Sequence, residues 1–397
     1  MTFPLPIPEP LRQALPPGTG VLLGISGGVD SAVTLGLLRA LGCDVQCVTF
    51  KNFCYSDDDF SFTDKSCCSL EAIDDARRLA RSFDASHWVA DVEEPFRTSV
   101  IEPFVAEYAR ARTPNPCLDC NGVVRFPELV RLAERQGCAF AATGHYARVT
   151  GEGKEARLLR GLDPDKDQSY FLHRIDRRLF GRLVFPLGWY VKDQVRAAAR
   201  RLGIAVADKR DSQEICFVPE GDRGFLFEQV DGKDNRALVT GDIVDKTGSI
   251  LGRHRGLIHY TVGQRKGLGV AAAEPLYVLE LDLDGGRLVV GPQNELKRLT
   301  VAGDGFVAAV PDFPDRWTSG GQLPDWAASA GGDVILQIRH RHQGARVKGW
   351  SLKDSGIQVD LLDPVDGAAP GQGLVLYAGD MVLGGARITS GPPGKGP

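Results

Sequence analysis

The glycine-rich turn at residues 25–31 is the feature that most constrains the fold. It reads Ile-Ser-Gly-Gly-Val-Asp-Ser, and it stands between the apolar run Val21–Leu23 and a run of helical character from residue 32 to residue 41. This order places backbone amides and a hydroxyl at a helix N-terminus, where two glycines allow a phosphate to approach the backbone. The sequence therefore predicts a nucleotide site, although an ordinary glycine turn between strand and helix has the same local pattern.

The turn differs from the phosphate loop that serves γ-phosphate transfer, because the GxxxxGK spacing and its lysine are missing. Its SGGxDS pattern resembles the pyrophosphate loop of ATP pyrophosphatases, a superfamily that cleaves ATP between the α- and β-phosphates to adenylate a substrate. The resemblance implies ATP, with Mg²⁺, as the nucleotide. Asp30 would then either position the magnesium ion or cap the following helix, and the two interpretations are compatible.

Short apolar runs alternate with segments of helical period between residues 45 and 143. The apolar runs are 45–50, 87–90 and 139–143, and the helical segments are 69–83 and 95–110. Strands that alternate with helices predict a parallel sheet covered on both faces. Ligands of such sheets bind beyond the carboxyl ends of the strands. We therefore expect the loops at 26–31, 50–52 and 143–145 to form one pocket.

After about residue 210 the pattern changes to short, glycine-punctuated strands, which predict antiparallel sheet or a small barrel. The expected strands are 276–281, 288–290, 334–338, 357–361 and 374–377, with a turn at 284–286. The Pro/Gly/Asp-rich stretch 304–332 is expected to be an insertion loop, and 391–397 a frayed tail. With the resemblance described below, the expected domains are an α/β, Rossmann-like nucleotide-binding domain at 1–212, a small central domain at 213–295 and an antiparallel β-barrel at 296–397.

Composition excludes several classes of protein. The chain has 397 residues, 43% of them hydrophobic, and a formal net charge of −4, so it can bury large cores but does not hold nucleic acid through bulk positive charge. No apolar run reaches the roughly 20 residues needed to cross a bilayer, and the first residues lack the features of a secretion signal. We therefore expect residence in the cytoplasm.

Nine cysteines in a long chain without a secretion signal indicate redox or metal chemistry rather than a disulfide scaffold. Residues 113–121, TPNPCLDCN, hold two of them in a segment stiffened by two prolines. A third, Cys216, lies in a polar stretch near the change of domain.

The other cysteines have simpler interpretations. Cys54, Cys67 and Cys68 are either a metal or sulfur-relay site or part of a loop before a helix, and the loop is favoured because CxxC spacing is absent. The remaining three lie in apolar contexts and are expected to be buried as small hydrophobic residues. They are Cys43, Cys47 and Cys138.

The order of motifs along the chain resembles that of the tRNA-specific 2-thiouridylases, which place sulfur on the wobble uridine of certain tRNAs. The shared motifs are SGGVDS at 26–31, TPNPCLDCN at 113–121, ATGHY at 142–146, DKDQSYFL at 165–172, EICFVPEG at 214–221, GLIHYTVGQRKGLG at 256–269 and PGQ at 370–372. Each motif is only moderately specific, whereas their order along the chain is difficult to obtain otherwise.

The resemblance implies that ATP adenylates the C2 oxygen of uridine, after which a cysteine persulfide delivers sulfur to C2 and AMP leaves. Cys120 matches the catalytic nucleophile and Cys216 the persulfide carrier. The residues implied to bind ATP are Gly24, Ile25, Ser26, Gly27, Gly28, Val29, Asp30, Ser31, Phe50 and Gly144. Those implied to meet the target base are Asn115, Pro116 and Cys117, and those implied to contact tRNA are His145, Lys166, Asp167, Gln168, Arg339, His340 and Gln372.

Cys117 departs from the family pattern, which has aspartate at this position. Together with Cys120 and Cys216 it offers three thiols, the soft ligands that an iron–sulfur cluster requires, so a cluster is an alternative to the persulfide and to a disulfide-forming Cys120. A thiolate nucleophile also needs a cationic neighbour or a lowered pKa, for which His145 and Arg125 are the candidates.

Two other functions fit parts of the pattern. An ATP-dependent ligase acting on a small molecule would need neither the cysteine pair nor the barrel, and a tRNA-binding module without activity would not need the intact loop. For the thiouridylase interpretation we expect the anticodon stem-loop of tRNA and a sulfur-donor or relay protein as partners. We also expect a monomer and no membrane association.

Overall fold

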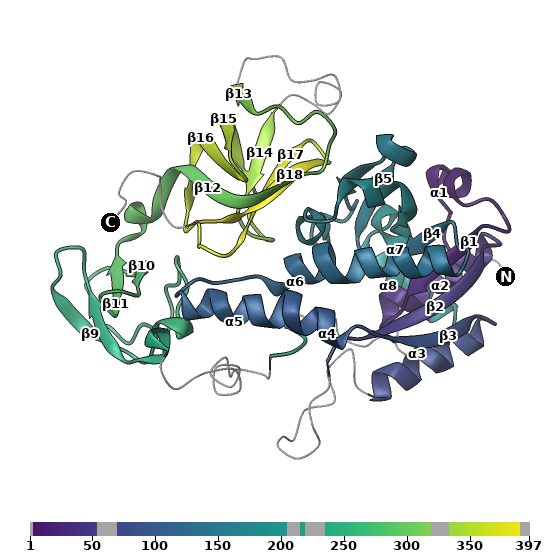
Figure 1. Cartoon of the computed structure of the whole chain (residues 1–397), viewed down its shortest axis with the longest axis horizontal. Helices are drawn as coiled ribbons and strands as arrows, with labels where there is room; N and C mark the ends of the chain where they lie inside the picture. The colour runs from purple at the N-terminus through teal and green to yellow at the C-terminus, as the bar shows by residue number, and fades with distance from the viewer. Residues whose placement is uncertain (1–2, 54–69, 205–214, 219–234, 319–332, 390–397) are drawn as a thin grey trace. The chain divides into compact units, whose positions relative to one another are not determined.

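The computed structural model describes residues 3–53, 70–204, 215–218, 235–318 and 333–389. It divides into two compact units (Figure 1). The first unit comprises Met1–Ser99, Cys117–Phe217 and Asp380–Val382, and the second comprises Val100–Pro116, Val218–Gly379 and Leu383–Pro397. Cys54, Cys67 and Cys68 lie outside the described residues, as do the boundary region near 212 and the predicted tail at 391–397.

A five-stranded parallel sheet forms the centre of the first unit. Its order is β3-β2-β1-β4-β7, with the bounds β1 Gly20–Gly24, β2 Asp44–Lys51, β3 Ser86–Asp91, β4 Phe140–Ala142 and β7 Leu183–Val184. All four pairings are parallel. The alternating pattern of the sequence therefore predicted the parallel sheet correctly. The strand order reverses at β1, since β2 and β3 lie on one side of it and β4 and β7 on the other.

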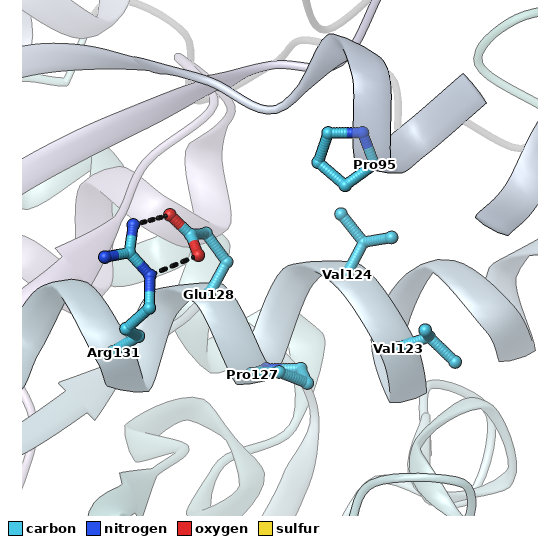
Figure 2. A pocket seen from close by; sticks show the side chains of 6 residues that line it. All are labelled: Pro95, Val123, Val124, Pro127, Glu128 and Arg131. Carbon is cyan, nitrogen blue, oxygen red and sulfur yellow. Dashed lines mark hydrogen bonds and ion pairs between the residues drawn. The ribbon is translucent and has the colours of Figure 1, made fainter. Parts of the chain in front are cut away.

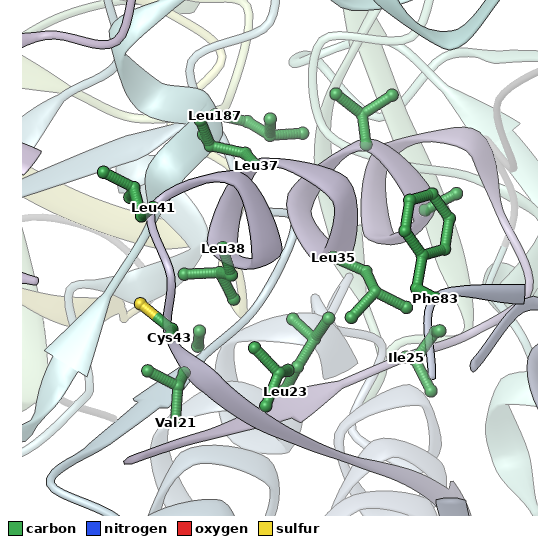
Figure 3. Close-up of a cluster of buried hydrophobic side chains, with 14 of the residues drawn as sticks. Val21, Leu23, Ile25, Leu35, Leu37, Leu38, Leu41, Cys43, Phe83 and Leu187 are labelled. Atoms are coloured by element: carbon green, nitrogen blue, oxygen red, sulfur yellow. The ribbon is translucent and has the colours of Figure 1, made fainter. Parts of the chain in front are cut away.

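Helices cover both faces of this sheet because successive residues of β1 point to opposite sides. Val21, Leu23 and Ile25 join the core formed with α2 (Val29–Ala40), α3 (Leu70–Ser82) and α8 (Lys192–Arg201), as Figure 3 shows in part. On the opposite face, a Cβ at Gly24 would lie 3.6 Å from Leu129 of α7 (Phe126–Arg135). The first unit also contains a short helix, α1 (Glu9–Ala14), and a hairpin of β5 (Ala147–Thr150) and β6 (Arg157–Arg160).

The helix predicted over 95–110 is made of three pieces. They are α4 (Glu93–Phe96), a π-helical turn (Arg97–Ile101) and α5 (Glu102–Ala109). The same order recurs later, where α6 (Pro116–Asp119) and a second π-helical turn (Cys120–Arg125) precede α7. Both π-helical turns come just before a proline, Pro103 or Pro127, whose missing N–H breaks the regular i→i−4 ladder.

A four-stranded sheet of order β10-β11-β8-β9 lies in the second unit. Its strands are β8 (Gly241–Val244), β9 (Ile250–His254), β10 (Tyr277–Asp282) and β11 (Arg287–Gly291). The sequence predicted β10, β11 and the turn between them, where the Gly285 amide donates to the Asp282 carboxylate over 2.9 Å. It did not predict β8 or β9, which lack a sustained apolar alternation.

An antiparallel barrel, closed by pairing of β12 with both β16 and β18, follows along the chain. Its strands are β12 (Lys297–Ala308), β13 (Arg316–Thr318), β14 (Val334–Gln337), β15 (Ala345–Lys353), β16 (Gly356–Asp366), β17 (Gly373–Ala378) and β18 (Met381–Ile388). The predicted insertion loop at 304–332 is wrong at both ends of its described part, because β12 continues to Ala308 and β13 occupies Arg316–Thr318. Residues 319–332 lie outside the described residues. The register shifts between Asp304 and Val307, where Gly305 has a φ of +63°, so these residues form a β-bulge.

In the part of the chain that the structure describes, no helix is both long enough and apolar enough to pass through a bilayer.

Candidate active site

The phosphate loop at 25–31 is shaped by Gly27. Its φ of +68° lies in the left-handed region that disfavours side chains, and a Cβ at this position would lie 3.0 Å from the carbonyl oxygen of Ala72. The Ser31 hydroxyl closes the loop by donating to the Gly28 carbonyl over 2.9 Å and accepting from the Ser26 amide over 3.4 Å. The first amides of α2, which have no acceptor within a helix, therefore lie at the loop, the arrangement that binds phosphate.

Two more loops begin at the same edge of the sheet, because the parallel strands β2 and β4 both end there. Phe50 stands near the end of β2, and Gly144 follows β4. A Cβ on Gly144 would lie 2.9 Å from the backbone carbon of Asp30 and 3.0 Å from the Ser31 nitrogen. Glycine therefore allows the loop after β4 to pack onto the start of α2, at the reversal of strand order where such sheets bind ligands.

Asp30 is held by two side chains that the sequence did not single out. The Lys192 ammonium lies 2.8 Å from each carboxylate oxygen, and the Tyr146 hydroxyl donates to one of them over 2.8 Å. Lys192 is only 6% exposed and stands at the start of α8, with its ammonium 5.5 Å from the centre of the Tyr146 ring. The three side chains tie the phosphate loop to α8 and to the ATGHY segment.

Asp30 does not fit a magnesium ligand in this arrangement. Magnesium needs carboxylate oxygens in a near-octahedral shell, whereas both oxygens of Asp30 already face an ammonium group. Gly28 is the N-cap of α2, and Asp30 lies in the first turn, where its charge is favourable to the helix dipole. The geometry thus gives Asp30 a loop-fixing role.

Cys120 begins the second π-helical turn and is 8% exposed. The 169–174 segment packs closely on this turn: a Cβ at Gly122 would lie 2.7 Å from Cβ of Arg174, and the side-chain Nδ2 of Asn121 donates to the Phe171 carbonyl over 3.2 Å. Arg174 also pairs with Asp119 at 3.0 Å. The DKDQSYFL motif therefore supports the helical turn that carries Cys120, a role that its position 50 residues away in sequence did not reveal.

Cys216 is partly exposed, and its neighbour Phe217 anchors it to the first unit. The Phe217 ring packs edge-on against Phe96 of α4 at 5.6 Å between centres, and Phe96 stacks on Phe53 at 6.1 Å. The helix α4 also contacts the π-helical turn that begins with Cys120. The segments that carry the two matched cysteines thus both contact α4, close to the carboxyl end of β2.

The iron–sulfur alternative finds no support in this geometry. Cys117 is exposed whereas Cys120 is buried, and the described ranges contain no group of three His, Cys, Asp or Glu side chains arranged to hold a metal. The prediction that Cys43, Cys47 and Cys138 are buried as small hydrophobic residues is confirmed. Burial raises the pKa of Cys43 to about 11 and that of Cys47 to about 12, and raises that of Cys138 as well.

A small cavity of about 160 Å³ lies beside the π-helical turn of Cys120 (Figure 2). Its lining is mostly apolar, and an ion pair between Arg131 and Glu128, with one bond of 2.7 Å, closes one side. Ligand pockets usually enclose roughly 300–1,000 Å³, so this cavity is too small for a nucleotide. The lining residues are Pro95, Val123, Val124, Pro127, Glu128 and Arg131.

His145 is half-buried between aromatic rings. Its ring lies 5.4 Å from that of Phe126 and 6.1 Å from that of Phe185, and its Nδ1 is 2.6 Å from the Thr143 hydroxyl. Burial lowers the pKa of His145 to about 3, and the charge of Arg125 contributes to the shift. His145 is therefore neutral at physiological pH and cannot act as a cationic neighbour of a thiolate. Arg125, which ends the π-helical turn of Cys120, retains that role as a hypothesis.

The matched segment 166–168 points partly inward. The Asp167 carboxylate accepts from the Gly161 amide at 3.0 Å and from Arg160 at 2.9 Å, and the Gln168 side chain accepts from the Tyr146 amide at 2.9 Å. Lys166 is partly exposed and lines a polar cavity of about 330 Å³ at the start of α8. The other residues lining this cavity are Asp163, Asp165, Val191, Lys192, Asp193 and Arg196.

The remaining matched residues belong to the second unit, apart from Cys117. Arg339 is exposed and donates to the Asp366 carbonyl over 3.1 Å, and His340 is partly exposed. Asn115 is partly exposed and Pro116 is buried. The Gln372 side chain donates to the carbonyl of Thr113 over 2.7 Å, a contact between residues 259 positions apart.

A parallel sheet with a glycine loop at its reversal of strand order, followed by a small sheet and a closed barrel, defines a nucleotide-binding α/β protein with two additional β domains. Family models match all three parts: the tRNA methyl transferase HUP domain at residues 19–220, the tRNA methyl transferase PRC-barrel domain at 233–292 and the aminomethyltransferase beta-barrel domain at 320–388. The chain belongs to the tRNA-specific 2-thiouridylase family, as its close relatives show.

Two of these relatives are named tRNA-specific 2-thiouridylase MnmA. The protein from Rhodospirillum rubrum is 42% identical over 94% of this chain and 97% of its own length, and that from Lachnoclostridium phytofermentans is 38% identical over 93% and 99%. Among solved structures, a 4-thiouridine synthetase in complex with RNA and ATP matches 51% of this chain and 46% of its own, with 19% identity and a TM-score of 0.33.

Proposed function

We propose that this protein uses ATP to replace the C2 oxygen of the wobble uridine of tRNA with sulfur, giving 2-thiouridine, AMP and pyrophosphate. The observation that carries the proposal is that the glycine loop at the start of α2 and both matched cysteines belong to one unit, in a chain that is about 40% identical to named thiouridylases over nearly its whole length. A small-molecule ligase would not need the two cysteines, and an inactive tRNA-binding module would not need the intact glycine loop.

The first step supported by this geometry is adenylation. The uridine O2 attacks the α-phosphorus of ATP, an O–P bond forms, and the bond to the β-phosphate oxygen breaks to release pyrophosphate. Residues 24–31 hold the phosphates, because the amides at a helix N-terminus favour negative charge. Phe50 and Gly144 line the adenosine end. Asp30 acts through its contacts to Lys192 and Tyr146, which fix the loop.

Sulfur transfer follows at the activated carbon. The terminal sulfur of a Cys216 persulfide bonds to C2, and AMP leaves with the former uridine oxygen. The Cys120 thiolate then attacks Sγ of Cys216, which breaks the S–S bond, leaves sulfur on C2 and forms a Cys120–Cys216 disulfide. A thiol reductant resets the pair, and a protein donor supplies the next sulfane sulfur. A partly exposed Cys216 is accessible to such a donor, and the exposed Cys117 beside a buried Cys120 favours this route over a cluster.

The tRNA is bound through local groups, since the net charge of −4 gives no bulk attraction. We assign phosphate or base contacts to the exposed or partly exposed side chains of Lys166, Arg339 and His340, and contact with the flipped uridine to Asn115, Pro116 and Cys117. An anticodon loop lowers the cost of flipping because its bases are single-stranded. His145, Asp167 and Gln168 contribute by shaping the surface. We place the protein in the cytoplasm, where tRNA is modified, as a monomer.

The nucleotide products test the proposal. Purified protein, an anticodon stem-loop RNA with uridine at the wobble position, MgATP, a persulfide donor of sulfane sulfur and a thiol reductant should form AMP and pyrophosphate together with 2-thiouridine, measured by chromatography and mass spectrometry. An RNA with cytidine at that position is the matched control and should remain unmodified. ADP as the sole nucleotide product, or sulfur on a small molecule only, would overturn the assignment.

A further inference from the structure

Thr113, the first residue of the TPNPC segment, is held from two sides within the second unit. It is 9% exposed. Its amide donates to the Pro370 carbonyl over 2.8 Å, its carbonyl accepts from the Gln372 side chain over 2.7 Å, and its hydroxyl donates to the Thr261 hydroxyl over 3.2 Å. All three polar groups of this residue are therefore used to fix the start of the segment that meets the target base.

The turn that holds Thr113 is itself fixed to the barrel. The Gly371 amide donates to the Ile388 carbonyl over 2.9 Å, and the Ile388 amide donates to the Gln372 carbonyl over 2.8 Å, at the end of β18. Gly371 has a φ of +94°, and a Cβ there would lie 2.9 Å from the carbonyl carbon and oxygen of Thr113. Glycine is thus required for the close approach that brings Gln372 within reach.

On its other side, Thr113 contacts the GLIHYTVGQRKGLG motif at residues 256–269. Thr261 lies in a turn closed by Gln264, whose side chain accepts from the Thr261 amide over 3.1 Å and whose own amide donates to the Thr261 carbonyl over 2.9 Å. The Gln264 side chain also donates to the Lys266 carbonyl over 2.9 Å. This motif thus presents a fixed hydroxyl to Thr113.

We infer that Gln372 is a positioning residue that sets the backbone of the base-binding segment, rather than a residue that acts chiefly by binding tRNA. Prolines 114 and 116 restrict the backbone on both sides of Asn115, so the placement of Thr113 is transmitted to Asn115 and Pro116. This role rests on the proposed function. It predicts that loss of the Gln372 donor slows the reaction of bound tRNA without weakening binding.

The test compares Gln372→Met, which keeps the length of the side chain and removes the donor, with Gln293→Met. Gln293 is an exposed glutamine of the same unit that donates to the Asp366 carboxylate over 3.0 Å. In Gln372→Met the single-turnover thiolation rate at saturating tRNA should fall about 10- to 100-fold, because small misplacements of reacting groups cost rates of this order. The dissociation constant for tRNA should stay within about twofold, the ordinary limit for an unchanged contact. Gln293→Met should match the wild type.

Hydrogen–deuterium exchange probes the contact between Gln372 and Thr113 and does not depend on thiolation. Residues 113–116 contain only two exchangeable amides, those of Thr113 and Asn115, because the others are prolines. Exchange in this stretch should be faster in Gln372→Met and unchanged in Gln293→Met. Gly371→Ala, whose Cβ would press on Thr113, should reproduce both the slower rate and the faster exchange.

An unchanged single-turnover rate in Gln372→Met would overturn the positioning role, as would unchanged exchange at 113–116. A weaker tRNA affinity with an unchanged rate at saturation would identify Gln372 as a tRNA contact instead. If the wild-type protein forms no 2-thiouridine, the proposed function fails, while the exchange measurement still decides whether Gln372 fixes Thr113.

Discussion

Single residues fix the phosphate loop through charge, and the clearest case is Lys192. Its ammonium is 2.8 Å from both oxygens of Asp30 and almost fully buried. In Lys192→Met the carboxylate would keep Tyr146 but lose its counter-charge. Removing one partner of a largely buried pair costs about 3–5 kcal/mol, and less where one side is partly exposed, as Asp30 is. We expect about 1–3 kcal/mol lower stability and roughly tenfold weaker ATP binding.

Calorimetric titration with ATP and urea unfolding measure the two effects. Lys154→Met is the matched control, because Lys154 is an exposed lysine of the same unit, and it should change neither quantity. Equal ATP affinity in Lys192→Met and wild type would show that the loop keeps its shape without this ion pair.

The buried His173 and the half-buried His145 make stability depend on pH. Burial lowers the pKa of His173 to about 4 and that of His145 to about 3, from an ordinary value of 6.5. At pH values between the lowered pKa of each histidine and 6.5, the unfolded chain binds more protons than the folded chain. The free energy of unfolding therefore falls as the pH drops below 6.5. Each histidine contributes at most about 1.4 kcal/mol per pH unit, and neither contributes above pH 7.

His173→Asn tests the contribution of one of them. His173 is fully buried, and its Nδ1 lies 2.7 Å from the Tyr170 carbonyl, so asparagine keeps a donor at that position and removes the titration. Urea unfolding between pH 5 and 7.5 should show a shallower pH dependence than the wild type. An identical slope in both proteins would mean that His173 is protonated equally in the folded and unfolded states.

Secondary-structure elements were predictable where their pattern is local. The strand, glycine turn and helix at 20–40 follow from apolar periodicity and from Gly27, and the structure places them as predicted. The π-helical turns were not predictable, because a spacing of five residues differs from the α-helical spacing by one position within a single turn. The sequence predicts a loop where β12 has its bulge, because Asp304 and Gly305 are residue types that are typical of loops and of β-bulges alike.

In the candidate site too, features with a local sequence pattern were predictable and contacts between distant residues were not. Sequence motifs predict the loop and the cysteines as candidate site residues, but they do not predict the side chains that hold them. Asp30 and Lys192 are 162 positions apart, and Gln372 and Thr113 are 259 apart, and no periodicity or spacing rule connects residues at such separations. Contacts of this kind are decided by the tertiary fold, so motif residues such as Asp167 and Gln372 are found to support backbone instead of standing free at a surface.

At the scale of the whole molecule, the proposed mechanism couples ATP cleavage to the chemistry of two thiols. In that proposal adenylation uses the phosphate loop, whereas sulfur transfer uses Cys120 and Cys216. Cys120→Ser and Cys216→Ser should therefore each abolish 2-thiouridine formation, by more than about a hundredfold, while ATP affinity stays within about twofold of the wild type. Cys138→Ala, which removes a buried thiol with a raised pKa, is the control and should retain thiolation.

A substitution at Cys117 distinguishes the persulfide route from the iron–sulfur route. Cys117 is the exposed thiol among Cys117, Cys120 and Cys216. A persulfide on Cys216 does not need it, so Cys117→Asp, which restores the residue common in the family, should keep thiolation within about threefold. A cluster would lose one of three protein ligands and its activity with it. Thiolation and iron content, measured together on anaerobically purified protein, therefore distinguish the routes: loss of both in Cys117→Asp would contradict the persulfide mechanism, because only a metal-bound sulfur makes that thiol indispensable.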